Sequence, residues 1–185
     1  MRPAALEAMT SASKSAVSID ALQAGASDVL SELTGAEAGL VTSGCFAALA
    51  LGTAACVAKL EVNVMNRLPA YAMRRDLEVI ICRHHRNSYD RAFEMCGCTL
   101  VEVGYLDTYL GVGVREVDRH EIEAAITPRT VAIAYVAIEG MGPSLRSVAE
   151  IGHAAGLPVI VDAANQVPPL ANLKRFIAGG PTSWR

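Results

Sequence analysis

The sequence predicts an α/β fold in which a mostly parallel sheet is covered by helices on both faces. Four short segments, at 77–82, 99–103, 130–137 and 158–161, are apolar almost throughout. Strands that are buried on both faces have this character. Segments with helical spacing of apolar residues alternate with them, which is the pattern of parallel α/β domains. The chain has 185 residues, enough for one domain with a core or for a piece of a larger one.

The N-terminal region predicts two helices and a short strand. Apolar residues between Ala4 and Leu33 recur at helical spacing, with a break near 18–20, and Gly35 is a typical helix stop. Residues 38–41 then predict a strand. It leads through Thr42-Ser43-Gly44 into an alanine-rich helix that begins near Cys45.

The remaining helices are predicted between the apolar strands. Their ranges are 88–96, 119–126, 145–155 and 170–178. Pro128 follows the second of these helices, and Gly156 ends the third. The stretch 104–117 is expected to be a loop over the sheet.

Composition excludes several classes of function. The net charge is −3, aromatic residues make up 5%, and no basic stripe is present, so nucleic-acid binding is not expected. The longest apolar stretch, 45–58, is interrupted by Gly52 and Thr53 and is too short for a membrane span. No signal-peptide pattern opens the chain, and a cytoplasmic location is expected.

The cysteines predict reduced thiols. Their number is odd, at five, and most have apolar neighbours. Cys96-Gly-Cys98 lacks a second pair of ligands, so no metal site is expected there.

Asp162 is the first candidate functional residue, because it directly follows the apolar residues 159–161. A carboxylate at the end of a buried strand needs a cationic or hydrogen-bonding partner. A cationic heteroaromatic nitrogen of a ligand would be such a partner. Capping of the following helix by Asp162 is the structural alternative.

The segment Thr42-Ser43-Gly44 is the second candidate. It joins a predicted strand to a helix, and the amides and dipole of a helix N-terminus bind phosphate. The segment fits neither a P-loop nor a dinucleotide-binding motif. An ordinary Ser or Thr helix cap is the alternative.

Two further candidates are a histidine pair and a cysteine. His84 and His85 follow a buried strand at its carboxyl end, the edge where ligands bind in open α/β sheets, although the pair also fits a polar surface turn. Cys45 begins a helix, where a thiolate is stabilised, and could act as a nucleophile with either histidine as base. A small apolar filler is the alternative reading of Cys45.

Taken together, these features match the needs of pyridoxal 5'-phosphate. Its phosphate needs amide donors, its ring needs a stacking partner, and its protonated ring nitrogen needs an anion.

The sequence also resembles the fold-type I pyridoxal-phosphate enzymes. The resemblance is to the group around selenocysteine synthase (seryl-tRNA selenium transferase) and D-glucosaminate-6-phosphate ammonia lyase. It extends over nearly the whole chain. It rests on "TGAEAGLVTSGCFAALALG", "RHHRNSYDRAFEMCGCTLVEVG" and the stretch around "GLPVIVDAANQVPPL". It implies the large domain of the aminotransferase-like fold.

The resemblance implies a role for each matching position. Four residues would form the phosphate site largely through backbone amides: Ser43, Gly44, Cys45 and Phe46. His85 would stack on the cofactor ring, Asp162 would pair with the ring nitrogen, and Ala164 would lie under the ring. Gln166 would reach the phenolic oxygen or the substrate, and Glu139 is expected to face the site.

No catalytic residue is assigned, because no lysine matches the family's Schiff-base position. The three lysines are Lys14, Lys59 and Lys174, all in predicted helical regions. We therefore expect residues 1–185 to be an incomplete cofactor-binding large domain. The N-terminal arm, the segment with the cofactor lysine and the C-terminal small domain would be absent, and "GGPTSWR" has the character of an altered ending.

The expected activity is that of a pyridoxal-phosphate-dependent lyase or transferase. It would remove the α proton of an amino acid or amino sugar acid, with elimination. The alternative is a catalytically inactive remnant that binds the cofactor weakly or serves only as an interaction module. The resemblance also implies a homo-oligomer with a small-molecule amino substrate.

Overall fold

The computed structural model describes residues 1–107, 113–114, 117–138 and 142–179. They form two compact units, one of residues 1–41 and one of the described residues from Thr42 onward. Among these residues, no helix combines the length and the apolar character that crossing a membrane requires.

The first unit contains the two predicted helices, α1 (Pro3–Ala12) and α2 (Ile19–Thr34). The side chain of Ser18 caps α2 by accepting a hydrogen bond from the backbone N–H of Ala21. Gly35 ends α2 in the left-handed conformation, with φ of 77°, which glycine adopts without steric cost. The predicted break and the predicted stop are both confirmed.

The prediction of a strand at 38–41 is wrong. This segment forms no ladder, and a side chain satisfies its backbone instead. The amide of Gln23 donates from Nε2 to the carbonyl of Val41 over 2.9 Å and accepts from the N–H of Val41 over 3.0 Å. An extended segment becomes a strand only when another strand pairs with it, and the local pattern of residues cannot show whether one does.

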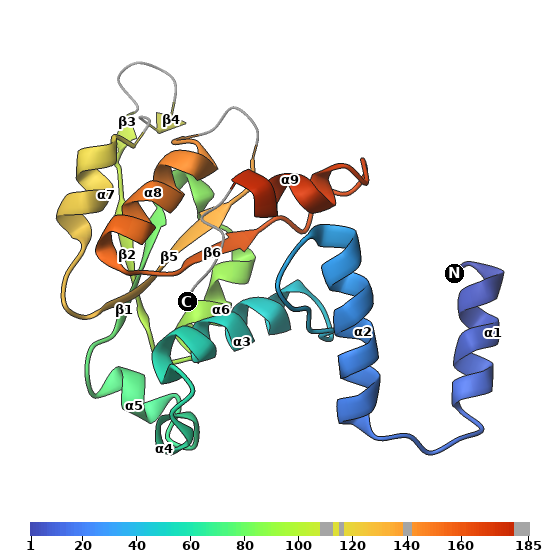
Figure 1. The fold of residues 1–185 in the computed structure, drawn as a ribbon. Coiled ribbons are helices and arrows are strands. Elements are labelled where there is room, and N and C mark those ends of the chain that lie inside the picture. The colour runs from blue at the N-terminus through green and yellow to red at the C-terminus, as the bar shows by residue number, and fades with distance from the viewer. Residues whose placement is uncertain (108–112, 115–116, 139–141, 180–185) are drawn as a thin grey trace. The chain divides into compact units, whose positions relative to one another are not determined.

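The second unit is built on a four-stranded parallel sheet with the strand order β2-β1-β5-β6 (Figure 1). The strands are β1 (Glu78–Cys82), β2 (Thr99–Val103), β5 (Thr130–Val136) and β6 (Val159–Asp162). All three pairings are parallel. The predicted α/β fold class is confirmed, and each of these strands lies within one residue of its predicted bounds.

Helices cover both faces of this sheet (Figure 1). One face packs against α3 (Cys45–Ala58) and α6 (Arg91–Met95), and the other against α7 (Arg119–Ala125) and α8 (Leu145–Ala155). Successive side chains of a strand alternate between the two cores. Val79 and Ile81 face the first pair of helices, whereas Ile80 and Cys82 face the second pair.

Some short elements were not predicted. Two four-residue helices, α4 (Val62–Met65) and α5 (Ala70–Met73), precede β1. Such short helices offer too few turns for a periodic pattern to reveal them. Within 104–117, the described residues form a short antiparallel pair, β3 (Leu106–Asp107) and β4 (Gly113–Val114).

The other predicted helices form with small differences. The helix predicted at 88–96 begins as a 3₁₀ turn, η2 (Ser88–Asp90), before α6. A second 3₁₀ turn, η1 (Arg83–His85), follows β1 directly. The last described helix is α9 (Asn172–Gly179).

Candidate functional site

The candidate site is a cavity of about 620 Å³ at the carboxyl edge of the sheet. In parallel α/β folds ligands bind at this edge, and the volume is in the range of small-molecule sites. The lining residues lie at or after the ends of β1, β5 and β6 or begin α3. They are Cys45, Asn87, Ser88, Tyr89, Val136, Ala137, Ile138, Asp162, Ala164, Asn165 and Gln166.

Asp162 lies at the end of β6, opposite Val136 in the register of the sheet. Its Oδ1 accepts the S–H of Cys45 at 3.4 Å and the backbone N–H of Ala164 at 3.1 Å. The carboxylate is therefore held beside the first turn of α3, where the helix dipole favours a negative charge. A cationic group in the cavity would meet this carboxylate.

Cys45 is not set up as a nucleophile. Burial is the main cause that raises the pKa of its thiol to about 11, and the hydrogen bond to Asp162 and the charge of Asp162 raise it further. A reactive cysteine needs a lowered pKa from cationic surroundings, and an anionic neighbour has the opposite effect. The surroundings of Cys45 therefore favour a protonated thiol that forms part of the cavity wall.

The N-terminus of α3 has the geometry of an anion site. Gly44 precedes the helix with φ of 135° and ψ of 178°, a conformation open almost only to glycine. Ser43 and Gly44 are exposed, and nothing lies within 4 Å of the place where a Cβ of Gly44 would be. The first amides of a helix have no partner within the helix, so they can serve a bound anion. Phe46 packs its side chain against the core, so only its backbone could take part.

His85 lies next to the cavity wall but is fully buried. Its Nδ1 accepts the N–H of Val136 over 3.4 Å, and Val136 lines the cavity. The ring makes edge contacts with Tyr135, at 4.8 Å between centroids, and with His84, at 4.3 Å. The stacking role inferred for His85 stays a prediction.

Gln166 and Ala164 both line the cavity, and their roles toward a cofactor stay predictions. Gln166 donates from Nε2 to the carbonyl of Ala137 over 2.6 Å, which fixes its side chain at the wall. A primary amide has a second N–H, which remains able to serve an oxygen atom in the cavity. Glu139, the other residue expected to face the site, lies outside the described residues.

Sequence reasoning missed four polar wall residues, Asn87, Ser88, Tyr89 and Asn165. All four lie in the segments that leave the sheet at its carboxyl edge. The histidine pair and Asp162 were found because they follow buried apolar strands. The same position after a strand could have identified these neighbours in "HRNSYD" and "DAANQ".

Neither lysine of the second unit, Lys59 or Lys174, lines this cavity, and all three lysines of the chain are exposed. Lys59 follows the last residue of α3, at the opposite end from Cys45. A helix of that length places them about 20 Å apart, at about 1.5 Å per residue. Lys174 is an exposed residue of α9, and Lys14 belongs to the first unit.

Two curated proteins resemble nearly the whole chain. The first is 5'-C-glycyluridine monooxygenase-decarboxylase from Streptomyces sp, which is 32% identical over 95% of this chain and 43% of its own length. The second is D-glucosaminate-6-phosphate ammonia lyase from Salmonella typhimurium, which is 27% identical over 96% of this chain and 47% of its own length. The chain thus spans less than half the length of either relative.

Solved structures show the same fold. A structure of D-glucosaminate-6-phosphate ammonia lyase matches 97% of this chain and 47% of its own, with a TM-score of 0.78 and 27% identity. A putative sugar aminotransferase from Streptococcus pneumoniae, solved in its PLP form, matches 77% of this chain and 35% of its own. Its TM-score is 0.53 at 18% identity, which supports the fold alone.

A family model covers most of the chain. The model of the DegT/DnrJ/EryC1/StrS aminotransferase family matches residues 27–175, which include the N-terminus of α3, the histidine pair and Asp162. The sheet, the cavity at its carboxyl edge and this match lead to one conclusion. The chain belongs to the DegT/DnrJ/EryC1/StrS aminotransferase family.

Proposed function

We propose that this chain supplies the cofactor-binding residues of a pyridoxal-phosphate-dependent lyase or transferase. Membership of the aminotransferase family indicates pyridoxal 5'-phosphate as the cofactor. One observation carries the rest of the proposal: Asp162 and the N-terminus of α3 border the same cavity. A group that can bind a cation and a helix N-terminus that can bind an anion thus border one small-molecule site.

The described residues fit this cofactor. The amides of Gly44, Cys45 and Phe46 would hold the phosphate, aided by the hydroxyl of Ser43. Asp162 would keep the ring nitrogen protonated, at the place where it now accepts the thiol of Cys45. Ala164 would lie under the ring, and Gln166 would donate its remaining N–H to the phenolic oxygen or the substrate.

When bound, pyridoxal phosphate supplies an electron sink for the negative charge left at the α carbon after proton removal. The contribution of Asp162 would be electrostatic, because its carboxylate would stabilise the protonated ring nitrogen on which that sink depends. Asn87, Ser88 and Asn165 offer amide and hydroxyl groups at the same wall, where a polar substrate would lie.

A lyase acting on an amino acid or amino sugar acid is the activity we favour. The similarity to D-glucosaminate-6-phosphate ammonia lyase in sequence and in structure supports it. The closer grouping with selenocysteine synthase rests on motif resemblance alone. A cytoplasmic homo-oligomer acting on a small amino substrate is part of the same proposal, with residues 1–185 forming an incomplete cofactor-binding large domain.

A catalytically inactive cofactor-binding form is the second candidate. It is favoured by the positions of Lys59 and Lys174, which are exposed and absent from the cavity wall. With neither lysine at the wall, the described residues of the second unit would hold the cofactor by non-covalent contacts only.

Titration with pyridoxal phosphate tests the proposal. Wild-type protein should bind the cofactor reversibly, and Asp162→Asn should bind it roughly tenfold to hundredfold more weakly, as expected for the loss of one charged hydrogen bond. Asp28→Asn is the matched control, because Asp28 is an exposed residue of the first unit. Equal affinity of wild type and Asp162→Asn would refute the proposed site.

Borohydride reduction followed by peptide mass spectrometry separates the two candidates. The inactive form predicts no specific adduct on any of the three lysines. A single adduct that disappears in Asp162→Asn would instead identify a catalytic lysine within these residues.

A further inference from the structure

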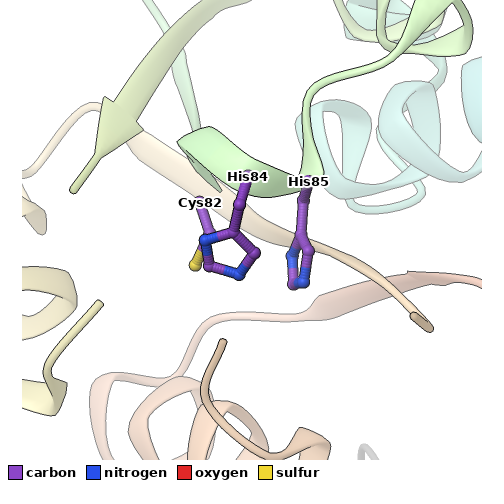
Figure 2. A group of neighbouring side chains, drawn as sticks. All are labelled: Cys82, His84 and His85. Atoms are coloured by element: carbon purple, nitrogen blue, oxygen red, sulfur yellow. The ribbon is translucent and has the colours of Figure 1, made fainter. Parts of the chain in front are cut away.

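A second group of potential ligands lies at the same sheet edge. Cys82, His84 and His85 each offer one donor atom, and these atoms all lie within 4.8 Å of one another. Figure 2 shows the thiol of Cys82, from the end of β1, beside the ring of His84, and the ring of His85 on the other side of His84; both histidines belong to the turn η1. We propose that Cys82, His84 and His85 bind a single thiophilic divalent cation of the Zn²⁺ type.

The type of ligand determines the type of ion. One thiolate and two imidazoles are soft or borderline donors, which favour zinc and its close substitute cobalt over magnesium or calcium. Three protein ligands with a fourth position for water or another small molecule is the usual arrangement of an open zinc site.

The distances allow such a site after a small adjustment. Zinc lies about 2.3 Å from sulfur and about 2.0–2.1 Å from nitrogen, so tetrahedral donors are roughly 3.3–3.6 Å apart. The present upper limit of 4.8 Å exceeds that by roughly 1.2–1.5 Å, which side-chain rotation can provide. The turn η1 keeps both histidines next to the end of β1, so no rearrangement of the sheet is needed.

The three proposed ligands differ in their exposure to solvent. Cys82 is 3% exposed and His85 is fully buried, whereas His84 is half-buried. His84 therefore lies on the side from which an ion would enter.

The proposed metal site differs from the cofactor site. Cys82 belongs to the core that faces α7 and α8, whereas Cys45 comes from α3 on the other face of the sheet. His85 is the one residue of this group to which the resemblance also assigns a role toward the cofactor. The cysteines considered from the sequence, Cys96 and Cys98, are not part of the group.

Titration of the untagged, reduced 185-residue chain with Co²⁺, without pyridoxal phosphate, tests the proposal. We expect binding of one ion per chain, with a thiolate-to-cobalt charge-transfer band and the visible absorption of tetrahedral cobalt. Cys82→Ser should abolish the charge-transfer band. His84→Gln should weaken binding at least tenfold, since even the loss of a supporting contact costs a metal site 10- to 100-fold in affinity.

Cys98→Ser is the matched control, because Cys98 is also a buried thiol, at 4% exposure, and is not in the group. It should keep the cobalt spectrum. The proposal is wrong if wild type shows no charge-transfer band, or if the band persists in Cys82→Ser.

X-ray absorption of wild-type protein loaded with Zn²⁺ covers the case in which Cys82→Ser does not fold. One sulfur and two imidazole nitrogens are expected around zinc. A shell with two or more sulfurs, or with none, would overturn the assignment. Because no cofactor is present in either experiment, a negative result leaves the proposed function untouched.

Discussion

Asp162 and Cys45 define the chemistry of the cavity at the level of single residues. The thiol of Cys45 donates to the carboxylate of Asp162, so the carboxylate is the anion of the pair and the thiol stays protonated. A cationic ligand would be attracted to the carboxylate of Asp162. A thiolate at Cys45 would be repelled by that carboxylate. The pair therefore favours binding of a cationic ring over cysteine-based catalysis.

Alkylation kinetics at Cys45 test this assignment. With its pKa raised from 9.0 to about 11, the thiol should react with iodoacetamide at neutral pH about 100-fold more slowly than a model thiol, because only the thiolate reacts. Asp162→Asn should speed the reaction, because it removes the anion, although the effect of burial remains. Peptide mass spectrometry gives the rate at Cys45 separately from the other cysteines. A wild-type rate equal to that of a model thiol would revive the nucleophile hypothesis.

The element that matters most to the site is α3, since it supplies both the anion-binding amides and Cys45. The turn that leads into α3 depends on Gly44, whose φ of 135° other residues rarely adopt. The hydroxyl of Thr42 supports this turn by donating to the carbonyl of Gly44 over 2.9 Å. A change at Gly44 therefore acts on the helix start rather than on packing.

Gly44→Ala should lower the free energy of unfolding by roughly 1–3 kcal/mol, the cost of a strained backbone conformation. It should also weaken pyridoxal-phosphate binding, because the amides that follow are displaced. Gly52→Ala is the matched control in the same helix. It has open space at its Cβ position and should be neutral or stabilising by roughly 0.5–1 kcal/mol. Urea unfolding and cofactor titration measure both effects. Equal behaviour of the two variants would contradict this role of Gly44.

In the second unit, the candidate binding cavity and a buried, ion-paired carboxylate lie at opposite edges of the sheet. The cavity lies at the carboxyl edge, whereas Glu78 begins β1 at the amino edge and is 7% exposed. Glu78 accepts hydrogen bonds from the hydroxyl of Thr127 over 2.7 Å and from Nε of Arg129 over 2.8 Å. These bonds tie the start of β1 to the turn before β5.

The net pKa of Glu78 is lowered. Burial raises it, but the hydrogen bonds from Thr127 and Arg129 and the charge of Arg129 outweigh burial. A carboxyl group with a lowered pKa stabilises the folded state above its unfolded pKa. That stability is lost as the pH falls through the folded pKa.

Arg129→Met should therefore destabilise the protein at pH 7 by roughly 1–3 kcal/mol, because a buried carboxylate loses its charged partner. The deficit should shrink at acidic pH, where Glu78 takes up a proton. Arg91→Met is the control, since Arg91 pairs with Glu94 on the surface with its side chain 70% exposed, and such pairs contribute little. Urea unfolding at pH 7 and pH 4 provides the comparison. A deficit independent of pH would show that Glu78 is not the group affected.

Much of the fold was predictable because its signals are local. Parallel strands buried on both faces are apolar throughout, so β1, β2, β5 and β6 stand out in the sequence. The strand predicted at 38–41 failed for the opposite reason, since strand formation depends on a neighbour and Gln23 binds this backbone instead. The position of Asp162 at the ligand-binding edge followed from strand polarity alone.

The sequence by itself determined the fold class, the strand ends and the edge at which Asp162 and the N-terminus of α3 would meet. Only the tertiary structure decided which side chains face one another there. It paired Cys45 with Asp162, buried His85 beside Tyr135, and brought Cys82 close to both histidines. The physical reason is that periodicity and turn residues act through the local backbone. Contacts between residues as far apart in the chain as Cys45 and Asp162 depend instead on the packing of whole elements.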